Sequence, residues 1–189
     1  EAELLGFIAD ISFAHLFVPS PEGPLVAHVP MVVMTDGNLR FHLARANPPA
    51  KYLDGALALA SFAGPDAYIS PDWYRSADQV PTWNYVTVEA RGRVRRLSEA
   101  DLIGNLDALS IVNERRLLPK KPWTRGKMRR GLFEGMLKAI VGFEMEVGDL
   151  RGTRKLGQNK DAADAQGAGG GLEAAGKGDM AALMRGGRG

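Results

Sequence analysis

The sequence contains few of the side chains that nucleophilic or metal-dependent catalysis requires. It has no cysteine, which excludes disulfides, thiolate nucleophiles and cysteine-ligated metals. Its only imidazoles are His15, His28 and His42. A three-histidine metal site is disfavoured, because such sites usually have carboxylate or cysteine support at short spacing. We therefore predict no metal site, and the sequence assigns no catalytic residue.

Nucleotide-binding loops are also missing. The glycine-rich run at residues 167–171 neither follows a predicted strand nor opens a convincing helix, so it is not a dinucleotide fingerprint. There is no phosphate-loop Gly-Lys-Ser/Thr segment and no nucleophile elbow. Because glycine is a poor helix former, we expect helix on either side of this run but not through it.

Four segments rich in aromatic, amide and basic side chains stand out, and they come in a distinctive order. They are Phe41–Pro48 (FHLARANP), Ala67–Tyr74 (AYISPDWY), Val80–Val86 (VPTWNYV) and Lys155–Asn159 (KLGQN). In this order the chain resembles the PaiB-type FMN-binding negative transcriptional regulators, from about Phe13 to Asn159. Two positions depart from the family pattern: Gly157 stands where serine is usual, and Lys160 where arginine is usual.

The resemblance implies a mainly β fold, an FMN-binding split β-barrel of the six-stranded Greek-key type with peripheral helices. It also implies a homodimer that holds FMN noncovalently in the groove between its subunits. The family's role is negative regulation of transcription, which a flavin would make redox-linked. The alternative is a flavin-dependent oxidoreductase of unknown substrate, similar to flavin reductases or pyridoxamine oxidases.

Three residues of the first segment suit the phosphate end of a flavin. Arg45, at the end of a predicted strand, offers a fork of N–H donors with a positive charge, and Asn47 beside a proline turn adds an amide. His42 lies on the polar face of the same strand and is expected to donate to the phosphate or the ribityl chain. The alternatives are an ordinary surface arginine and a half-buried histidine bonded to backbone.

The later segments suit the isoalloxazine ring. The aromatic rings of Trp83 and Tyr85 can stack on it or wall it, and the amide of Asn84 matches its mixed donor and acceptor edge. Core packing is the alternative for the two aromatic residues. Gln158 and Asn159 are expected to reach the flavin of the partner subunit, with a plain turn as the alternative.

Alternating apolar residues and turn signals predict the strands that position these side chains. The predicted strands are Phe13–Val18, Leu25–Met34, Leu39–Ala44, Ala56–Phe62, Pro81–Arg96 and Ala139–Val147. A capping-box pattern at Ser98 and Asp101 starts a helix that Pro119 ends, and a second helix is expected from about Lys127 to Leu137. Aromatic residues between two strands are expected to seal the dimer interface: Tyr68, Trp73 and Tyr74.

Composition is that of an ordinary globular protein. The 189 residues are 45% hydrophobic and 24% charged, with a formal net charge of +2. We expect a split-barrel domain over residues 1–155 and a Gly/Ala-rich tail, helical or partly flexible, over 156–189. No apolar run is long enough to cross a bilayer, so we expect a cytoplasmic protein with no membrane contact. Because the chain opens with Glu1, we also expect that native N-terminal residues precede it.

One basic cluster raises the question of DNA. Eight lysines and arginines lie within Arg115–Arg130, with Trp123 among them. Such a stripe could neutralise DNA phosphates, but prolines and a glycine interrupt the layout of a recognition helix. A solvated basic loop is the better interpretation, and we expect weak, nonspecific association with DNA at most.

Overall fold

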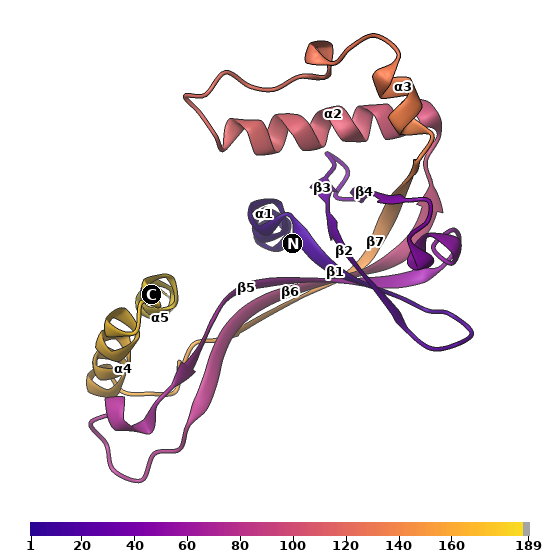
Figure 1. The fold of residues 1–189 in the computed structure, drawn as a ribbon. Helices are drawn as coiled ribbons and strands as arrows, with labels where there is room; N and C mark the ends of the chain where they lie inside the picture. The colour runs from indigo at the N-terminus through magenta and orange to yellow at the C-terminus, as the bar shows by residue number, and fades with distance from the viewer. Residues whose placement is uncertain (187–189) are drawn as a thin grey trace. The chain divides into compact units, whose positions relative to one another are not determined.

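The computed structural model describes residues 1–186, and its architecture is a seven-stranded sheet with five α-helices (Figure 1). The sheet order is β2-β1-β5-β6-β7-β4-β3. The strands are β1 (Phe13–Val18), β2 (Leu25–Pro30), β3 (Val32–Val33), β4 (Leu39–Ala44), β5 (Leu57–Ile69), β6 (Thr82–Arg96) and β7 (Ile140–Lys155). The α-helices are α1 (Ala2–Ile11), α2 (Glu99–Arg115), α3 (Leu132–Leu137), α4 (Ala162–Ala174) and α5 (Gly178–Gly186). Single turns of 3-10 helix are η1 (Pro48–Lys51), η2 (Pro71–Trp73) and η3 (Arg125–Lys127).

All six predicted strands are present, and the second is divided in two. Pro30 has no N–H to donate, so the pairing of β2 with β1 stops there. The N–H of Met31 instead donates to the carbonyl of Ser12 at 2.7 Å, and β3 begins at Val32. Strands β5 and β7 are both longer than predicted from their alternating apolar segments. They continue to Ile69 and Lys155.

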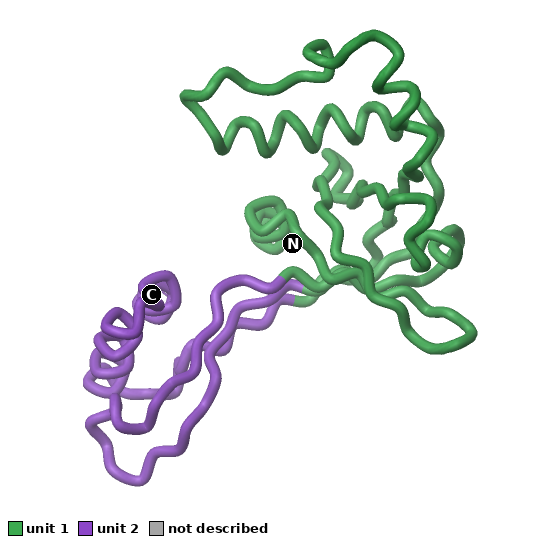
Figure 2. Tube along the Cα trace, in the orientation of Figure 1, with its two compact units in different colours: residues 1–62, 89–151 green, residues 63–88, 152–189 purple. Residues whose placement is uncertain are grey.

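Two compact units make up the chain (Figure 2). Unit 1 contains residues 1–62 and 89–151, and unit 2 contains residues 63–88 together with the chain from 152 onward. Strands β5, β6 and β7 contribute residues to both units. The predicted division into residues 1–155 and 156–189 stays a prediction.

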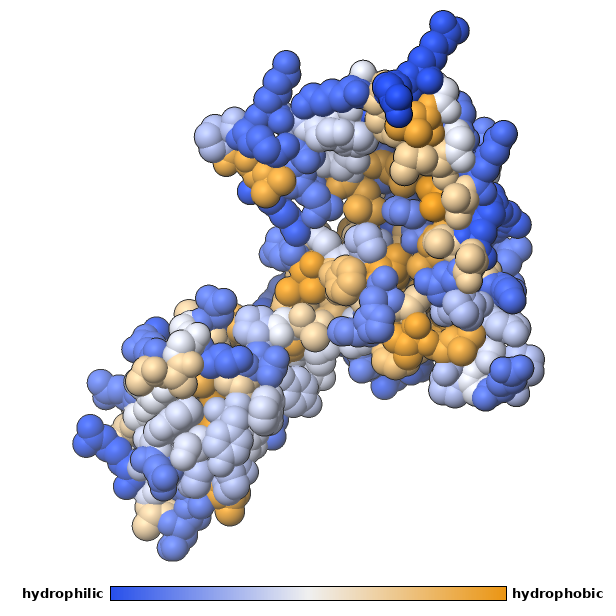
Figure 3. All heavy atoms as spheres, viewed as in Figure 1, coloured by the Kyte–Doolittle hydropathy of each residue, from blue (hydrophilic) through white to orange (hydrophobic). Residues whose placement is uncertain are grey.

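The core of unit 1 follows from alternation along its strands. On β4, Leu39, Phe41 and Leu43 are buried, and Phe41 stacks on Phe143 of β7 with ring centroids 5.6 Å apart. Helix α2 begins as the capping box predicts, because Ser98 Oγ accepts a hydrogen bond from the Asp101 N–H at 3.1 Å. Figure 3 shows apolar side chains gathering beneath α2 on one face of the unit.

Helix α1 is not among the predicted helices, although the sequence contains the apolar spacing of a helix there. Leu4, Ile8 and Ile11 recur at helical spacing, and Ile8 is fully buried. Helix α3 covers only the last part of the predicted 127–137 helix. Among residues 1–186, none of the helices has the length and apolar content to span a bilayer.

The glycine run forms helix, so that prediction is wrong. Helix α4 passes through residues 167–171 without interruption. A Cβ on Gly167 would lie 2.1 Å from the backbone oxygen of Trp73, and one on Gly171 would lie 2.2 Å from the Trp73 ring. These glycines let α4 lie directly against η2, and this packing offsets their poor helix propensity.

Candidate functional site

The end of β4 holds Arg45 in a defined place in unit 1. Pairing of β4 with β7 ends at Ala44 and Ile140, after which the Arg45 N–H donates to the Ala139 carbonyl at 2.9 Å. The side chain then donates from Nε to the Lys138 carbonyl at 2.8 Å. This bond uses one of the guanidinium nitrogens and leaves both Nη groups without a partner among residues 1–186. Arg45 can therefore offer two donors to a ligand.

A cationic cleft surrounds this arginine. Arg45, Arg96 and Lys138 line it together with the start of α2, including Glu99, and its volume is about 340 Å³. The three cations are exposed, so none of them is committed to the core. Their combined charge and donors suit a phosphate better than a neutral ligand. The sequence predicted Arg45 alone, because Arg96 and Lys138 are distant in the chain and only the meeting of β4, β6 and β7 brings them together.

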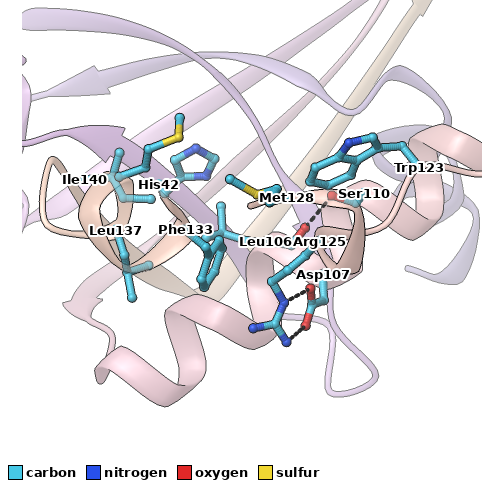
Figure 4. Close-up of a pocket in the computed structure, with 11 residues that line it drawn as sticks. His42, Leu106, Asp107, Ser110, Trp123, Arg125, Met128, Phe133, Leu137 and Ile140 are labelled. Carbon is cyan, nitrogen blue, oxygen red and sulfur yellow. Dashed lines mark hydrogen bonds and ion pairs between the residues drawn. The ribbon is translucent and has the colours of Figure 1, made fainter. Parts of the chain in front are cut away.

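His42 lies on β4 but lines a different cavity. It forms part of a largely apolar space of about 320 Å³ between β4, α2 and the segment that follows α2 (Figure 4). Its Nδ1 is buried and has no hydrogen-bond partner among residues 1–186. Burial lowers the pKa of His42, so the ring stays neutral near pH 7. Leu137 is common to this cavity and the cationic cleft.

The lowered pKa of His42 predicts a pH-dependent stability. Unfolded, the ring takes up a proton near pH 6.5; folded, it does so only at lower pH. The unfolded chain therefore binds more protons as the pH falls below about 6.5, and the folded state loses stability there. When the pH is lowered from 7.5 to 5.5, the urea midpoint of both proteins should fall. We expect the fall to be smaller for His42→Gln than for the wild type. Equal slopes for the two proteins would contradict this assignment.

Asn47 lies just beyond Arg45, before η1. Its backbone N–H donates to the Ala44 carbonyl at 3.0 Å, and its carbonyl accepts from the Ala50 N–H at 2.9 Å. The side chain is half-buried and makes no cap hydrogen bond. The structure thus places Arg45 and Asn47 just past the end of β4, whereas His42 lines the other cavity.

The other predicted site residues belong to unit 2. Along β6, Trp83 and Tyr85 are exposed and Asn84 is buried, so they point to opposite faces of the strand. A flavin ring bound on one face of β6 can contact either the Trp83 and Tyr85 rings or the Asn84 amide, but not all three side chains. Asn84 Nδ2 contacts Met184 Sδ at 3.4 Å, and its Oδ1 has no partner. Their role in flavin binding stays a prediction.

Gln158 and Asn159 follow β7 in a tight turn. The Gln158 amide accepts from the Leu156 N–H at 3.0 Å and donates to the Arg154 carbonyl at 2.7 Å. Asn159 is exposed. Gly157, directly before Gln158, has a φ of 70°, in the left-handed region that favours glycine. Gln158 therefore stabilises its own turn within the subunit, and contact with a partner's flavin stays a prediction.

Half of the eight cations in the basic cluster are engaged within unit 1. Arg125 makes a two-pronged ion pair with Asp107, at 2.9 and 2.8 Å, and Lys120 pairs with Glu114. Arg116 donates to the Ala9 carbonyl at 2.6 Å, and Lys127 donates to a backbone carbonyl at 2.9 Å. Lys120 and Arg125 thereby hold the segment after α2 onto α2, and Arg116 bonds to α1. Only part of the cluster remains available for phosphates.

The three histidines do not lie together. His15 and His28 face each other across β1 and β2 with ring centroids 5.0 Å apart, and His42 is on another strand. Within residues 1–186, no three histidine, aspartate or glutamate side chains gather as a metal site.

Comparison with known proteins identifies the family. A family model described as "Putative FMN-binding domain" matches residues 1–149. The chain is 31% identical over 166 residues to the protease synthase and sporulation protein PAI 2 of Bacillus subtilis, covering 86% of this chain and 79% of that protein. The chain belongs to this FMN-binding domain family. The predicted PaiB-type membership is confirmed, and FMN is the cofactor.

More distant matches include an uncharacterised protein and solved structures that share the fold. An uncharacterised protein of Emericella nidulans is 28% identical over 197 residues, covering 82% of this chain and 78% of its own. The FAD and heme binding protein from Mycobacterium smegmatis has a similar structure, with a TM-score of 0.63 at 19% identity over 86% of this chain and 74% of that one. The flavocytochrome Anf3 from Azotobacter vinelandii gives 0.56 at 19% identity, over 82% and 67%. The predicted mainly β, split-barrel fold is confirmed.

Proposed function

We propose that the protein is a PaiB-type, FMN-binding negative regulator of transcription whose activity depends on the state of its flavin. The cationic cleft at the end of β4 carries this proposal, because it supplies an anion site beside a largely apolar cavity. Bound FMN supplies a centre that accepts or donates one or two electrons. Such a role requires the compartment that holds the DNA, which agrees with the expected cytoplasmic location.

The residues around the cleft fit the phosphate end of FMN. Arg45 presents two unpaired Nη groups from a position fixed by its bond to the Lys138 carbonyl. Arg96 and Lys138 add two charges on the walls. Asn47, two residues after Arg45, adds an amide just past the end of β4. A dianionic phosphate would be bound by charge-assisted hydrogen bonds, which are stronger than neutral ones.

Replacing Arg45 tests this placement. Arg45→Ala is expected to weaken FMN binding at least fivefold, since it removes a charge-assisted contact that contributes about 1 kcal/mol or more. Flavin fluorescence titration measures the change. Arg129→Ala is the matched control, because it removes one exposed positive charge outside the cleft. Equal affinities for Arg45→Ala and wild type would remove Arg45 from the site.

The flavin site is proposed to be completed by a second copy of the chain. Tyr68 and Trp83 of unit 2 are 47% and 50% exposed and lie ring to ring at 6.1 Å, with Tyr85 nearby on the same face of β6. Exposed aromatic clusters of this kind are typical of protein interfaces. Light scattering is expected to give twice the chain mass with FMN bound. A monomer mass would contradict the dimer.

The flavin-dependent oxidoreductase is the second candidate, and one observation favours it. Because Arg116, Lys120, Arg125 and Lys127 are engaged by protein acceptors, the basic cluster offers phosphate contacts from only half of its eight cations. Two measurements separate the roles: bleaching of the visible flavin spectrum by a nicotinamide donor, and anisotropy titration of the native upstream DNA against scrambled DNA. Discrimination on the order of 10³-fold would support direct repression. Turnover of the flavin without DNA discrimination would support the oxidoreductase.

A further inference from the structure

His15 and His28 form a pair of imidazoles on the outer face of β1 and β2 in unit 1. They are directly opposite each other in the strand register. The next pair in the register, Leu16 and Ala27, is buried in the core. Because successive side chains of a strand point to opposite faces, the two imidazoles face away from the core, with His15 half-buried and His28 exposed. Neither histidine lines the cationic cleft that is proposed to bind the flavin phosphate.

The ring nitrogens of this pair are available to a ligand. The two rings contact each other, with centroids 5.0 Å apart and planes at 85°. Neither ring makes a hydrogen bond with any group in the part of the chain that the structure describes. A neutral imidazole has one nitrogen that donates a proton and one whose lone pair can bind a metal ion. Each histidine can therefore supply one metal ligand without losing a contact within the protein.

The distance between the rings matches that of two imidazoles bound to one tetrahedral metal ion. A Zn–N bond is about 2.0–2.1 Å long, so a bound zinc ion lies roughly 3.2 Å from the centre of each ring. At the tetrahedral angle the two ring centres are then roughly 5.2 Å apart, and at a right angle roughly 4.5 Å apart. The observed 5.0 Å is closer to the tetrahedral value. The χ2 angle of histidine is broadly distributed, and its rotation can turn one nitrogen of each ring toward a shared ion while the ring centres stay nearly in place.

We infer that His15 and His28 together bind a divalent transition-metal ion, Zn²⁺ by its geometry, with water in the remaining coordination positions. Within residues 1–186 no third histidine, aspartate or glutamate gathers with them, so the protein supplies two ligands. Imidazole suits Zn²⁺, whereas Mg²⁺ prefers oxygen ligands. Side chains on paired strands are positioned more precisely than side chains on loops. The inference departs from the sequence-based prediction of no metal site, which considered all three histidines as ligands of one ion.

The place of the pair in the sheet gives the ion a path from solvent and a consequence for the fold. Strand β2 is at an edge of the sheet and is paired with β1. An ion held by one histidine from each strand links this edge strand to its neighbour. Because the unfolded chain does not hold the two imidazoles together, Zn²⁺ is expected to bind the folded state preferentially and to raise the melting temperature.

Calorimetric titration of the tag-free chain with Zn²⁺ tests the inference, with Mg²⁺ as the control ion. The wild type is expected to bind one Zn²⁺ per chain and no Mg²⁺. His15→Ala and His28→Ala are each expected to weaken Zn²⁺ binding at least about tenfold, since even changes in the outer shell of a metal site cost that much. Ser61→Ala is the matched control: Ser61 is opposite His15 on β5, and its loss removes a polar side chain beside the pair but no imidazole. Zn²⁺ should raise the melting temperature of the wild type and Ser61→Ala, and not that of His28→Ala.

Histidine ring resonances in the NMR spectrum of the wild type test the same inference without a substitution. The chain has three histidines, and one equivalent of Zn²⁺ should shift the resonances of His15 and His28 together and leave those of His42 unchanged. Two independent sites would give the wild type two ions per chain and leave the affinity unchanged in each single variant, which would overturn the inference. The absence of saturable Zn²⁺ binding would also overturn it, since the pair would then be an aromatic contact only.

Discussion

Gly167→Ala is expected to destabilise the protein by about 3 kcal/mol, because a Cβ at this position would lie 2.1 Å from the backbone oxygen of Trp73. The clashing atom is backbone, so it cannot move aside as the end of a flexible side chain would. Relief requires α4 to move away from η2. That movement would stretch the hydrogen bonds that Asp164 of α4 accepts from the Arg75 and Ser76 N–H groups, at 2.7 and 2.9 Å.

Gly170→Ala is the matched control in the same helix. Nothing lies within 4 Å of a Cβ built there, and the position is exposed. Since alanine is the better helix former, this variant is expected to stabilise the protein by about 1 kcal/mol. Urea unfolding measures both variants against the wild type. If the two substitutions change the free energy of unfolding in the same direction, the result would contradict the close packing of α4 against η2.

The same glycines show where sequence reasoning succeeds and where it fails. Alternation of apolar residues predicts β4 to the residue, because burial of one face is a local property of a strand. The glycine run misleads, because its low helix propensity is local and the compensating contact with Trp73 is not. No pattern within residues 162–174 reports which side chain lies against the helix.

For the candidate site, too, local features could be predicted from the sequence and long-range contacts could not. The residues of one segment, Arg45 and Asn47, are found from their types and order, and the structure places them together at the end of β4. Arg96 and Lys138 give no signal, since an isolated basic residue after a strand or helix is ordinary. The faces of Trp83 and Asn84 could have been separated by the strand period alone. The cavity beside His42 depends on how the segment after α2 folds back, which the sequence does not specify.

Glu144→Ala is expected to cost about 3 kcal/mol through loss of an ion-pair cluster at the centre of the sheet. Glu144 lies on β7, between β6 and β4 in the strand order, and its side chain is only 5% exposed. One carboxylate oxygen pairs with Arg40 of β4, directly opposite in register, and the other with Arg95 of β6. The carboxylate therefore joins three neighbouring strands.

The size of the effect follows from which groups are left behind. Removing one partner of a buried ion pair typically costs about 3–5 kcal/mol, since the remaining charge stays desolvated. The lower end applies here, because Arg95 is 58% exposed and Arg40 keeps a second carboxylate, Asp101, at 3.6 Å. For a protein of this length, a loss of 3 kcal/mol lowers the melting temperature by about 6–12 °C.

Glu146→Ala is the matched control, two residues further along β7 on the same face and exposed. It is expected to change stability by less than about 0.5 kcal/mol. Adding Arg40→Met to Glu144→Met tests the cause: an apolar pair should recover part of the loss, since the less exposed of the two arginines is then no longer left without Glu144. Urea unfolding of the wild type, Glu144→Met, Arg40→Met and the double variant gives the coupling between the two positions. If Glu144→Ala and Glu146→Ala were equally mild, the carboxylate would not hold the three strands together.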